Sequence, residues 1–265
     1  MKRTSLLGLF TLGMLAAAFF MPPIHQSTAY HHFANHAEHL GIPNFWNVIS
    51  NIAFLLVALA AWHRHGTNSI HFRILIAGTA LTAFGSAYYH AQPSDARLVW
   101  DRLPMTIVFV CIFTFTISER IDTRLARVLF WPLLSLGVAS VFYWRATGDL
   151  RPYVAVQFYP LIAVPLMRCL PVNTANRRLA RAQWAMIACY GLAKVAELFD
   201  SRLQGIIPAG AHAWKHILAA LGLFLYTQAL SANQRADSQL VSANDTPAAN
   251  SSKRISHESP DLSKQ

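Results

Sequence analysis

Long apolar blocks are the feature that most constrains how this chain can fold. The 265 residues are 54% hydrophobic and 13% charged, and the apolar residues fall into blocks of roughly 15–20, about the length that crosses a bilayer. Inside a bilayer a helix satisfies its own backbone hydrogen bonds, so the blocks predict an all-α, polytopic membrane protein. They lie at residues 5–21, 45–62, 72–90, 104–118, 127–144, 153–167, 184–199 and 212–230.

The first block allows two interpretations. A basic start, Lys2-Arg3, precedes an apolar run that ends at two prolines, and small residues follow at 27–29. This order is typical of a secretory signal peptide, although an uncleaved anchor helix has the same apolar core. Residues 1–29 are therefore assigned to a signal peptide or an N-terminal anchor helix. Either interpretation leaves Tyr30 on the outer side of the membrane.

The seven later blocks predict a seven-transmembrane helix bundle over residues 30–230. Nine arginines lie in or just beyond the connections that follow the first, third and fifth of these blocks, against five at the opposite connections. Arginine and lysine accumulate on the cytoplasmic side of a membrane, so we expect a multi-pass protein of the cell membrane with a cytoplasmic C-terminus. Residues 231–265 are polar without apolar periodicity, which predicts a disordered cytoplasmic tail.

The net charge of +10 does not indicate a nucleic-acid partner. The arginines stand at the ends of apolar blocks, and no basic patch with interleaved aromatic residues accompanies them. The three cysteines, Cys111, Cys169 and Cys189, share no short spacing. Neither a disulfide framework nor a cysteine metal site is predicted, and the sequence does not define the oligomeric state.

Two histidines at the start of the last block have the spacing of a metal site. His212 and His216 are four residues apart, which places them one above the other on the same face of a helix. Placing a histidine at the edge of a membrane helix costs free energy, so its presence there indicates a specific role. The expected topology brings His90 and Asp101 to the same outer layer of the bundle, with Ser86 one turn below His90. These residues form a candidate zinc site near the outer face.

The residue types suggest a catalytic site. Three neutral imidazoles leave zinc one open position, as in catalytic zinc centres, and zinc lowers the pKa of a bound water to roughly 7. No carboxylate lies between His212 and His216, so Asp101 is the nearest candidate for the general base. Ser86 could donate a hydrogen bond to an oxyanion. Structural interpretations stay open: histidines bonded at the head-group level, Asp101 as a helix cap, and Ser86 bonded to its own helix.

A second polar set lies near the end of the preceding block. Lys194 and Glu197 are three residues apart and can pair on one helix face, so we expect a structural ion pair there. Asp200 should reach the outer layer, where it could orient a ligand histidine. Lys215 could face either a lipid head group or Asp200.

Four segments that contain these residues resemble the alkaline ceramidases, which are seven-helix intramembrane zinc amidases in a superfamily of membrane hydrolases and receptors. The resemblance extends over about residues 30–230 and holds in order and spacing. The segments are FWNVISN at 45–51, Ser86-x-x-x-His90, DRLPM at 101–105 and HAWKHIL at 212–218.

The resemblance implies a zinc site of three histidines, with one carboxylate that handles protons and one serine at the oxyanion. The implied residues are His90, His212 and His216 for Zn²⁺, Asp101 for the protons and Ser86 for the oxyanion. The implied reaction converts a ceramide-like lipid, the expected substrate, to a fatty acid and a sphingoid base. The alternatives are a hydrolase of the same superfamily acting on another acyl lipid, or a non-catalytic receptor or sensor with a vestigial zinc site.

The segment before the first core helix departs from the eukaryotic members of that family, which carry an acidic calcium-binding sequence there. It reads YHHFANHAEH at residues 30–39, and Glu38 is its only carboxylate. Calcium takes several hard oxygen ligands, so this segment gives little support for a Ca²⁺ requirement. Its histidines could hold a softer metal or belong to a solvated loop; they are His31, His32, His36 and His39.

Overall fold

The computed structural model describes residues 3–64, 69–169 and 176–244, and these ranges are helical without a β-strand. The all-α prediction is confirmed, and each predicted block lies largely within one helix or, for 45–62, within two consecutive ones. The elements are α1 (Arg3–Phe20), the 3-10 helix η1 (Thr28–His31), α2 (Phe45–Ile49), α3 (Ile52–His63), α4 (Ile70–Ala91), α5 (Asp95–Arg120), α6 (Thr123–Thr147), α7 (Arg151–Cys169), α8 (Arg177–Leu198) and α9 (Ala211–Asn244).

Four helical segments of the described chain are long and apolar enough to cross a membrane. They are Phe45–His63, which joins α2 and α3, and the helices α4, α5 and α6. The later helices are interrupted by other residue types: α7 contains Pro160 and Pro165, and α8 begins with an arginine-rich turn. The four apolar segments fit a membrane protein.

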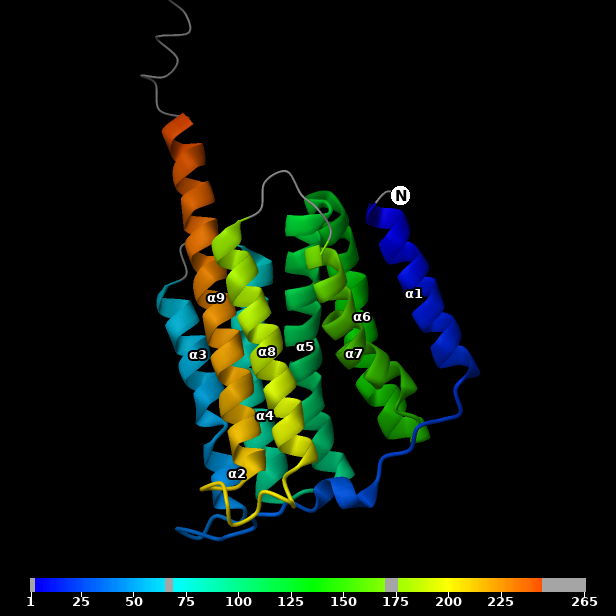
Figure 1. Cartoon of the computed structure of the whole chain (residues 1–265), viewed down its shortest axis with the longest axis vertical. Helices are drawn as coiled ribbons and strands as arrows, with labels where there is room; N and C mark the ends of the chain where they lie inside the picture. The colour runs from blue at the N-terminus through cyan, green and yellow to red at the C-terminus, as the bar shows by residue number, and fades with distance from the viewer. Residues whose placement is uncertain (1–2, 65–68, 170–175, 245–265) are drawn as a thin grey trace, which may run out of the picture.

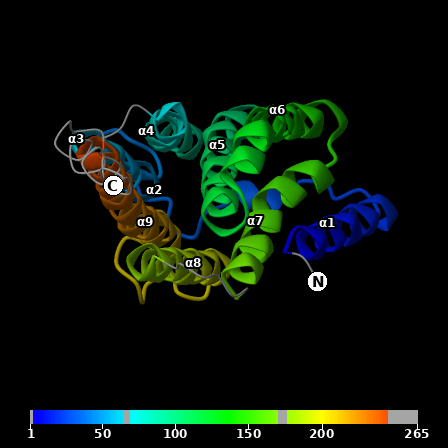
Figure 2. The same cartoon turned by 90° about the horizontal axis from the view of Figure 1, so that it is seen from above.

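The helices pack as a bundle in which sequence neighbours lie side by side (Figure 1). Contacts run from α3 through α4, α5 and α6 to α7, and α9 packs on both α8 and α3. Helix α5 also contacts α7 and is the most buried of the four apolar segments. Helix α1 stands at the edge of the bundle against α7 (Figure 2), where the Thr11 and Tyr159 hydroxyl oxygens are 2.7 Å apart.

Helices α4 and α5 approach each other closely at Gly85. A Cβ atom at Gly85 would lie 2.0 Å from the carbonyl oxygen of Trp100, so a side chain there would force the helices apart. Pro104 lies inside α5. Because proline has no N–H, the Trp100 carbonyl four residues earlier lacks its helical donor, and this oxygen faces Gly85. The crossing brings the next residues of the two helices, Ser86 and Asp101, together.

The last helix continues past the boundary predicted at residue 231. Helix α9 reaches Asn244, so residues 231–244 are helical and not the disordered tail that we predicted. Contacts far apart in sequence support the extension: Asn176 donates a hydrogen bond to the Asn233 side chain, and Arg235 donates to the Arg64 carbonyl oxygen at 2.7 Å. Residues 245–265, the rest of the predicted tail, lie outside the described residues.

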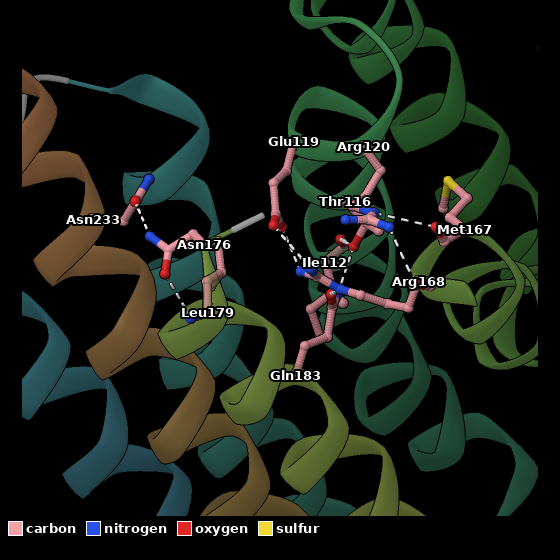
Figure 3. A network of polar contacts seen from close by, with 10 residues as sticks. All are labelled: Ile112, Thr116, Glu119, Arg120, Met167, Arg168, Asn176, Leu179, Gln183 and Asn233. Carbon is pink, nitrogen blue, oxygen red and sulfur yellow. Dashed lines mark hydrogen bonds and ion pairs between the residues drawn. The ribbon is translucent and has the colours of Figure 1, made fainter. Parts of the chain in front are cut away.

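A polar network joins α5, α7 and α8 at the end of α5 opposite Asp101 (Figure 3). Arg168 donates to the Glu119 carboxylate at 2.8 Å and also to the Gln183 side chain. Gln183 in turn donates to the Thr116 hydroxyl at 2.5 Å. Arg120 donates to two backbone carbonyl oxygens at the end of α7, both at 3.1 Å. These bonds hold that end of the bundle together.

Candidate metal centre

Three histidines gather where α4 ends and α9 begins. The distances between ring centroids are 4.9 Å for His90–His212, 4.7 Å for His90–His216 and 5.2 Å for His212–His216. One ring nitrogen from each lies within 4.8 Å of the others, and the three side chains are buried. The structure therefore brings together the three histidines that the sequence singled out.

The unpaired nitrogens of these rings fit a bound cation. Both ring nitrogens of His90, and Nε2 of His212 and His216, are buried and have no hydrogen-bond partner in the described chain. An unpaired buried polar atom costs about 1–3 kcal/mol, and one cation shared by the three imidazoles would satisfy a nitrogen of each. The triad could thus hold a metal ion. Within the described residues, no other group of His, Cys, Asp and Glu side chains has this arrangement.

Ser50 contacts the ring of His216 and is placed to orient it. The Ser50 oxygen lies 2.8 Å from Nδ1 of His216, while the Ser50 hydroxyl donates its proton to the Asn47 carbonyl oxygen at 3.2 Å. With its proton on that carbonyl, Ser50 can accept a hydrogen bond from Nδ1–H, and this tautomer leaves Nε2 of His216 unprotonated and open to a metal. The sequence interpretation gave Ser50 no role. The available signal was the set of polar residues at 47, 50 and 51 in an otherwise apolar block.

Asp200 and Phe33 secure the triad from the loop side. The two carboxylate oxygens of Asp200 accept from the backbone N–H groups of His212 and Ala34, each at 2.9 Å. Asp200 thus ties the start of α9 to the N-terminal segment and contacts the backbone of His212, as a residue that orients this histidine would. The Phe33 ring packs on His90 and His212, with centroid distances of 4.7 and 4.6 Å.

Asp101 and Ser86 meet at the crossing of α4 and α5. Both side chains are buried, and the Ser86 hydroxyl donates a hydrogen bond to the Asp101 carboxyl group. Oδ1 of Asp101 has no partner in the described chain, so it can accept a proton or a hydrogen bond from a bound molecule. The helix-cap interpretation of Asp101 is wrong, because Ser94 caps α5 by accepting from the Arg97 N–H.

A cavity of about 330 Å³ connects these groups with the interior of the bundle. Ser86, Asp101 and His216 all line it, so one histidine of the triad and both predicted catalytic residues face one space. The rest of the lining is mostly apolar, with contributions from Val108, Ile112, Val164 and Leu223. Convergent polar groups in a mainly apolar cavity suit an amphipathic ligand.

The predicted Lys194–Glu197 ion pair is present, and a second lysine joins it. Lys194 donates to one carboxylate oxygen of Glu197 and Lys215 donates to the other at 2.9 Å. Lys215 therefore pairs with Glu197 and not with Asp200. All three residues line the cavity. Arg102 also lines it and is buried, although the sequence interpretation used this arginine only to orient the chain in the membrane.

The histidine-rich segment 30–39 forms no second metal cluster among the described residues. Nε2 of His31 lies 3.1 Å from the Asp95 carboxylate, and its Nδ1 lies 3.0 Å from the Tyr89 hydroxyl. These contacts fit the solvated-loop interpretation better than the metal-binding one. The exposed side chains of the segment include His32, His36, Glu38 and His39.

Comparison with known proteins gives one family. The family model described as Ceramidase matches residues 30–244, a range that contains the histidine triad, Ser86 and Asp101. Among the curated proteins searched, none matched the chain.

Proposed function

The chain belongs to the ceramidase family, whose model covers most of its length, and on this premise we propose that it is a zinc-dependent amidase of membrane lipids. The proposed reaction hydrolyses the amide bond of a ceramide-like lipid to a fatty acid and a sphingoid base. The observation that carries the proposal is the buried triad with unpaired ring nitrogens. One of its histidines, His216, faces an apolar cavity together with Asp101.

His90, His212 and His216 would hold the zinc ion. Neutral imidazole is a common zinc ligand, and a set of three leaves the fourth position of a tetrahedral site open. When bound, zinc supplies a Lewis acid that activates water as a nucleophile at neutral pH. The chain orients these ligands. Ser50 contacts Nδ1 of His216, so that Nε2 is the nitrogen left for the metal. Phe33 packs against the rings of His90 and His212.

Asp101 is proposed to move the protons. Its unpaired Oδ1 can take a proton from the attacking water and return it to the leaving nitrogen, which must be protonated before the carbon–nitrogen bond breaks. Ser86 holds the carboxyl group through a hydrogen bond. Rotation of the same hydroxyl toward the substrate would let it donate to the developing oxyanion.

We further propose seven membrane-spanning helices, formed by the α2–α3 pair and by α4 to α9. Four of these segments meet the length and hydropathy expected of a span, and the arginine excess supports a cytoplasmic C-terminus. The metal centre would then lie near the outer face of the cell membrane. Residues 1–29 remain a signal peptide or an anchor helix, and in the second case α1 would stay packed on α7.

Metal content and hydrolysis of one defined lipid test the function. The purified full-length protein should carry about one zinc ion per chain and release lauric acid from N-lauroylsphingosine. His216→Ala should lose both zinc and activity. Asp101→Asn should keep zinc but lose about 10²–10⁴-fold in kcat, as expected when a general acid–base group is removed.

His63→Ala is the matched control, because His63 is an exposed histidine at the end of α3. It should keep both zinc and activity. A folded protein that binds no zinc would contradict the proposed metal. Zinc binding with turnover of ester lipids alone would indicate another hydrolase of the superfamily, and zinc binding without any turnover would favour a receptor.

A further inference from the structure

Arg102 is a buried arginine that has no role in the proposed hydrolysis. Its side chain lines the same cavity as Asp101 and His216, and the residue is only 5% exposed. The guanidinium lies over three aromatic rings, with its Cζ atom 4.1 Å from the Trp144 centroid, 4.6 Å from the Tyr153 centroid and 5.8 Å from the Tyr30 centroid. These rings hold the planar group in a defined orientation at the cavity wall.

The guanidinium of Arg102 is only partly hydrogen-bonded. Nη2 donates to Oε1 of Gln26 at 2.5 Å, whereas Nη1 is buried and has no partner in the described chain. Arginine carries five N–H donors in a rigid fork that matches a carboxylate or a phosphate. Buried polar groups with a purely structural role are normally hydrogen-bonded, so the unpaired Nη1 indicates that a ligand binds here.

The other cations of the cavity each have a carboxylate partner within the protein. Lys194 and Lys215 share the carboxylate of Glu197. The second carboxylate of the cavity, Asp101, makes no ion pair with Arg102, and no other carboxylate in the described chain does so. Arg102 is therefore the cavity cation that has no carboxylate partner in the described chain.

We propose that the substrate carries a carboxylate or phosphate on the amine half of the lipid amide, and that Arg102 binds this anion. The inference rests on the proposed amidase function and names its substrate class. Along α5, the apolar lining residues Val108 and Ile112 lie two to three turns beyond Asp101, whereas the guanidinium of Arg102 reaches Gln26 in the segment between α1 and η1. An acyl chain beside these apolar residues, with its amide at Asp101, places the amine half next to Arg102.

Two matched pairs of substrates test the proposal. The first pair is N-lauroylsphingosine and its 1-phosphate, and the second is N-lauroylethanolamine and N-lauroylglycine. Within each pair the principal difference is the anion, and the pairs distinguish a phosphate from a carboxylate. In uncharged detergent micelles, the zinc-loaded full-length protein should show a kcat/KM about tenfold or more higher for the anionic member of at least one pair, as expected for hydrogen bonds to a charged group.

Arg102→Gln should bring this ratio close to one, mainly through KM, and Arg102→Lys should keep part of it because the charge remains. Arg97→Gln is the matched control. Arg97 lies on the same helix and also stacks on a tyrosine, Tyr88, but it does not line the cavity. The control should keep the wild-type ratio. Equal or faster hydrolysis of the neutral members by the wild type, or an unchanged ratio in Arg102→Gln, would overturn the proposal.

The binding of the same four lipids separates this inference from the proposed hydrolysis. If no lipid is cleaved, the amidase proposal fails, and the ratio of Kd values within each pair then decides the role of Arg102. Tighter binding of an anionic member by the wild type, lost in Arg102→Gln but kept in Arg97→Gln, supports it. Equal Kd values within both pairs contradict it, and so does a preference that survives in a folded Arg102→Gln variant.

Discussion

The hydroxyl group of Ser50 contacts Nδ1 of His216, which leaves Nε2 as the nitrogen available to a metal. When Ser50 donates its proton to the Asn47 carbonyl oxygen, its oxygen can accept from Nδ1–H of His216. Partners of this kind hold a ligand histidine in one tautomer and one orientation. The geometry of the site therefore depends on a residue that does not itself bind the metal.

Ser50→Ala should weaken zinc binding by about 10–100-fold, the usual effect of losing a partner that orients a ligand. Competition with a chelator of known affinity measures this change in the purified protein. Ser135→Ala, at an exposed position of α6, provides the control and should leave the affinity unchanged. Equal zinc affinities for Ser50→Ala and the wild type would show that the contact has no role in metal binding.

The sequence predicted the histidine triad but not the groups that complete its surroundings. The four-residue spacing of His212 and His216 is a local signal, because it puts both rings on one helix face. The contact of Ser50 with His216 joins residues 166 positions apart, and no local pattern encodes it. The burial of Arg102 was also not predictable. An arginine beside an apolar block can lie at the membrane surface or in a cavity wall, and the sequence around it is the same in both cases.

Among the helices, the crossing of α4 and α5 positions the proposed proton-transfer group. Gly85 lets α4 approach the Trp100 carbonyl oxygen, and Pro104 leaves that oxygen without its helical hydrogen bond. Asp101 and Ser86 are the next residues on the two helices and are hydrogen-bonded to each other. Their contact therefore depends on a glycine that has no chemistry of its own.

Gly85→Ala should lower both stability and activity. A Cβ atom 2.0 Å from a backbone oxygen requires the helices to separate, and overpacking of this kind costs about 1–3 kcal/mol. The same shift would pull Ser86 away from Asp101. Thermal unfolding in detergent and the rate of lipid hydrolysis measure the two effects.

Gly191→Ala is the control for Gly85→Ala, because Gly191 lies within α8 and a Cβ atom there would meet nothing within 4 Å. It should leave the activity intact and keep or slightly raise the stability, since alanine is favoured over glycine in a helix by about 0.5–1 kcal/mol. A Gly85→Ala variant as stable and active as the control would mean that the helices accommodate the extra atom without moving the site.

Helix positions were more predictable than helix ends. A helix that crosses a bilayer needs a long apolar segment, so the hydropathy of the sequence located α4, α5 and α6 directly. The end of α9 is different, because its last turns are polar. Contacts of Asn233 with Asn176 and of Arg235 with Arg64 support the first turn past the predicted boundary, and local composition does not include these contacts.

For the molecule as a whole, the histidine triad links helices that have little direct packing between them. His90 belongs to α4, and the other two histidines belong to α9, while α3 packs against both of these helices in the described structure. A bound metal would therefore connect the two sides of the bundle. Ligands that bind only the folded state stabilise it by mass action, by about 4 kcal/mol at a thousandfold excess over Kd.

Removal of zinc should consequently lower the Tm of the wild-type protein, and zinc addition should restore it. In His90→Ala the Tm should respond much less to chelator or zinc, because the link from α4 is missing. Thermal unfolding with and without chelator measures both responses. The same Tm for the zinc-loaded and zinc-free wild type would contradict a metal that bridges the helices.

The opposite end of the bundle depends on the buried network around Arg168 (Figure 3). Arg168 binds Glu119 and Gln183, and so connects α7 with α5 and α8. Removing Arg168 leaves Glu119 unpaired at a partly buried position, and the cost of breaking a fully buried ion pair, about 3–5 kcal/mol, is the upper bound. Arg168→Met should therefore lower the Tm strongly, whereas Arg178→Met, at an exposed position of α8, should change stability by no more than about 0.5 kcal/mol.

The double variant Arg168→Met/Glu119→Met distinguishes an unpaired charge from a loss of packing. With both charges replaced by apolar side chains of similar length, neither member of the ion pair remains to be desolvated, so the double variant should be more stable than Arg168→Met alone. Zinc content should be unchanged in both variants, because the network lies at the end of α5 opposite Asp101. Equal destabilisation in the single and double variants would instead assign the role of Arg168 to its bond with Gln183 and to the volume that it fills.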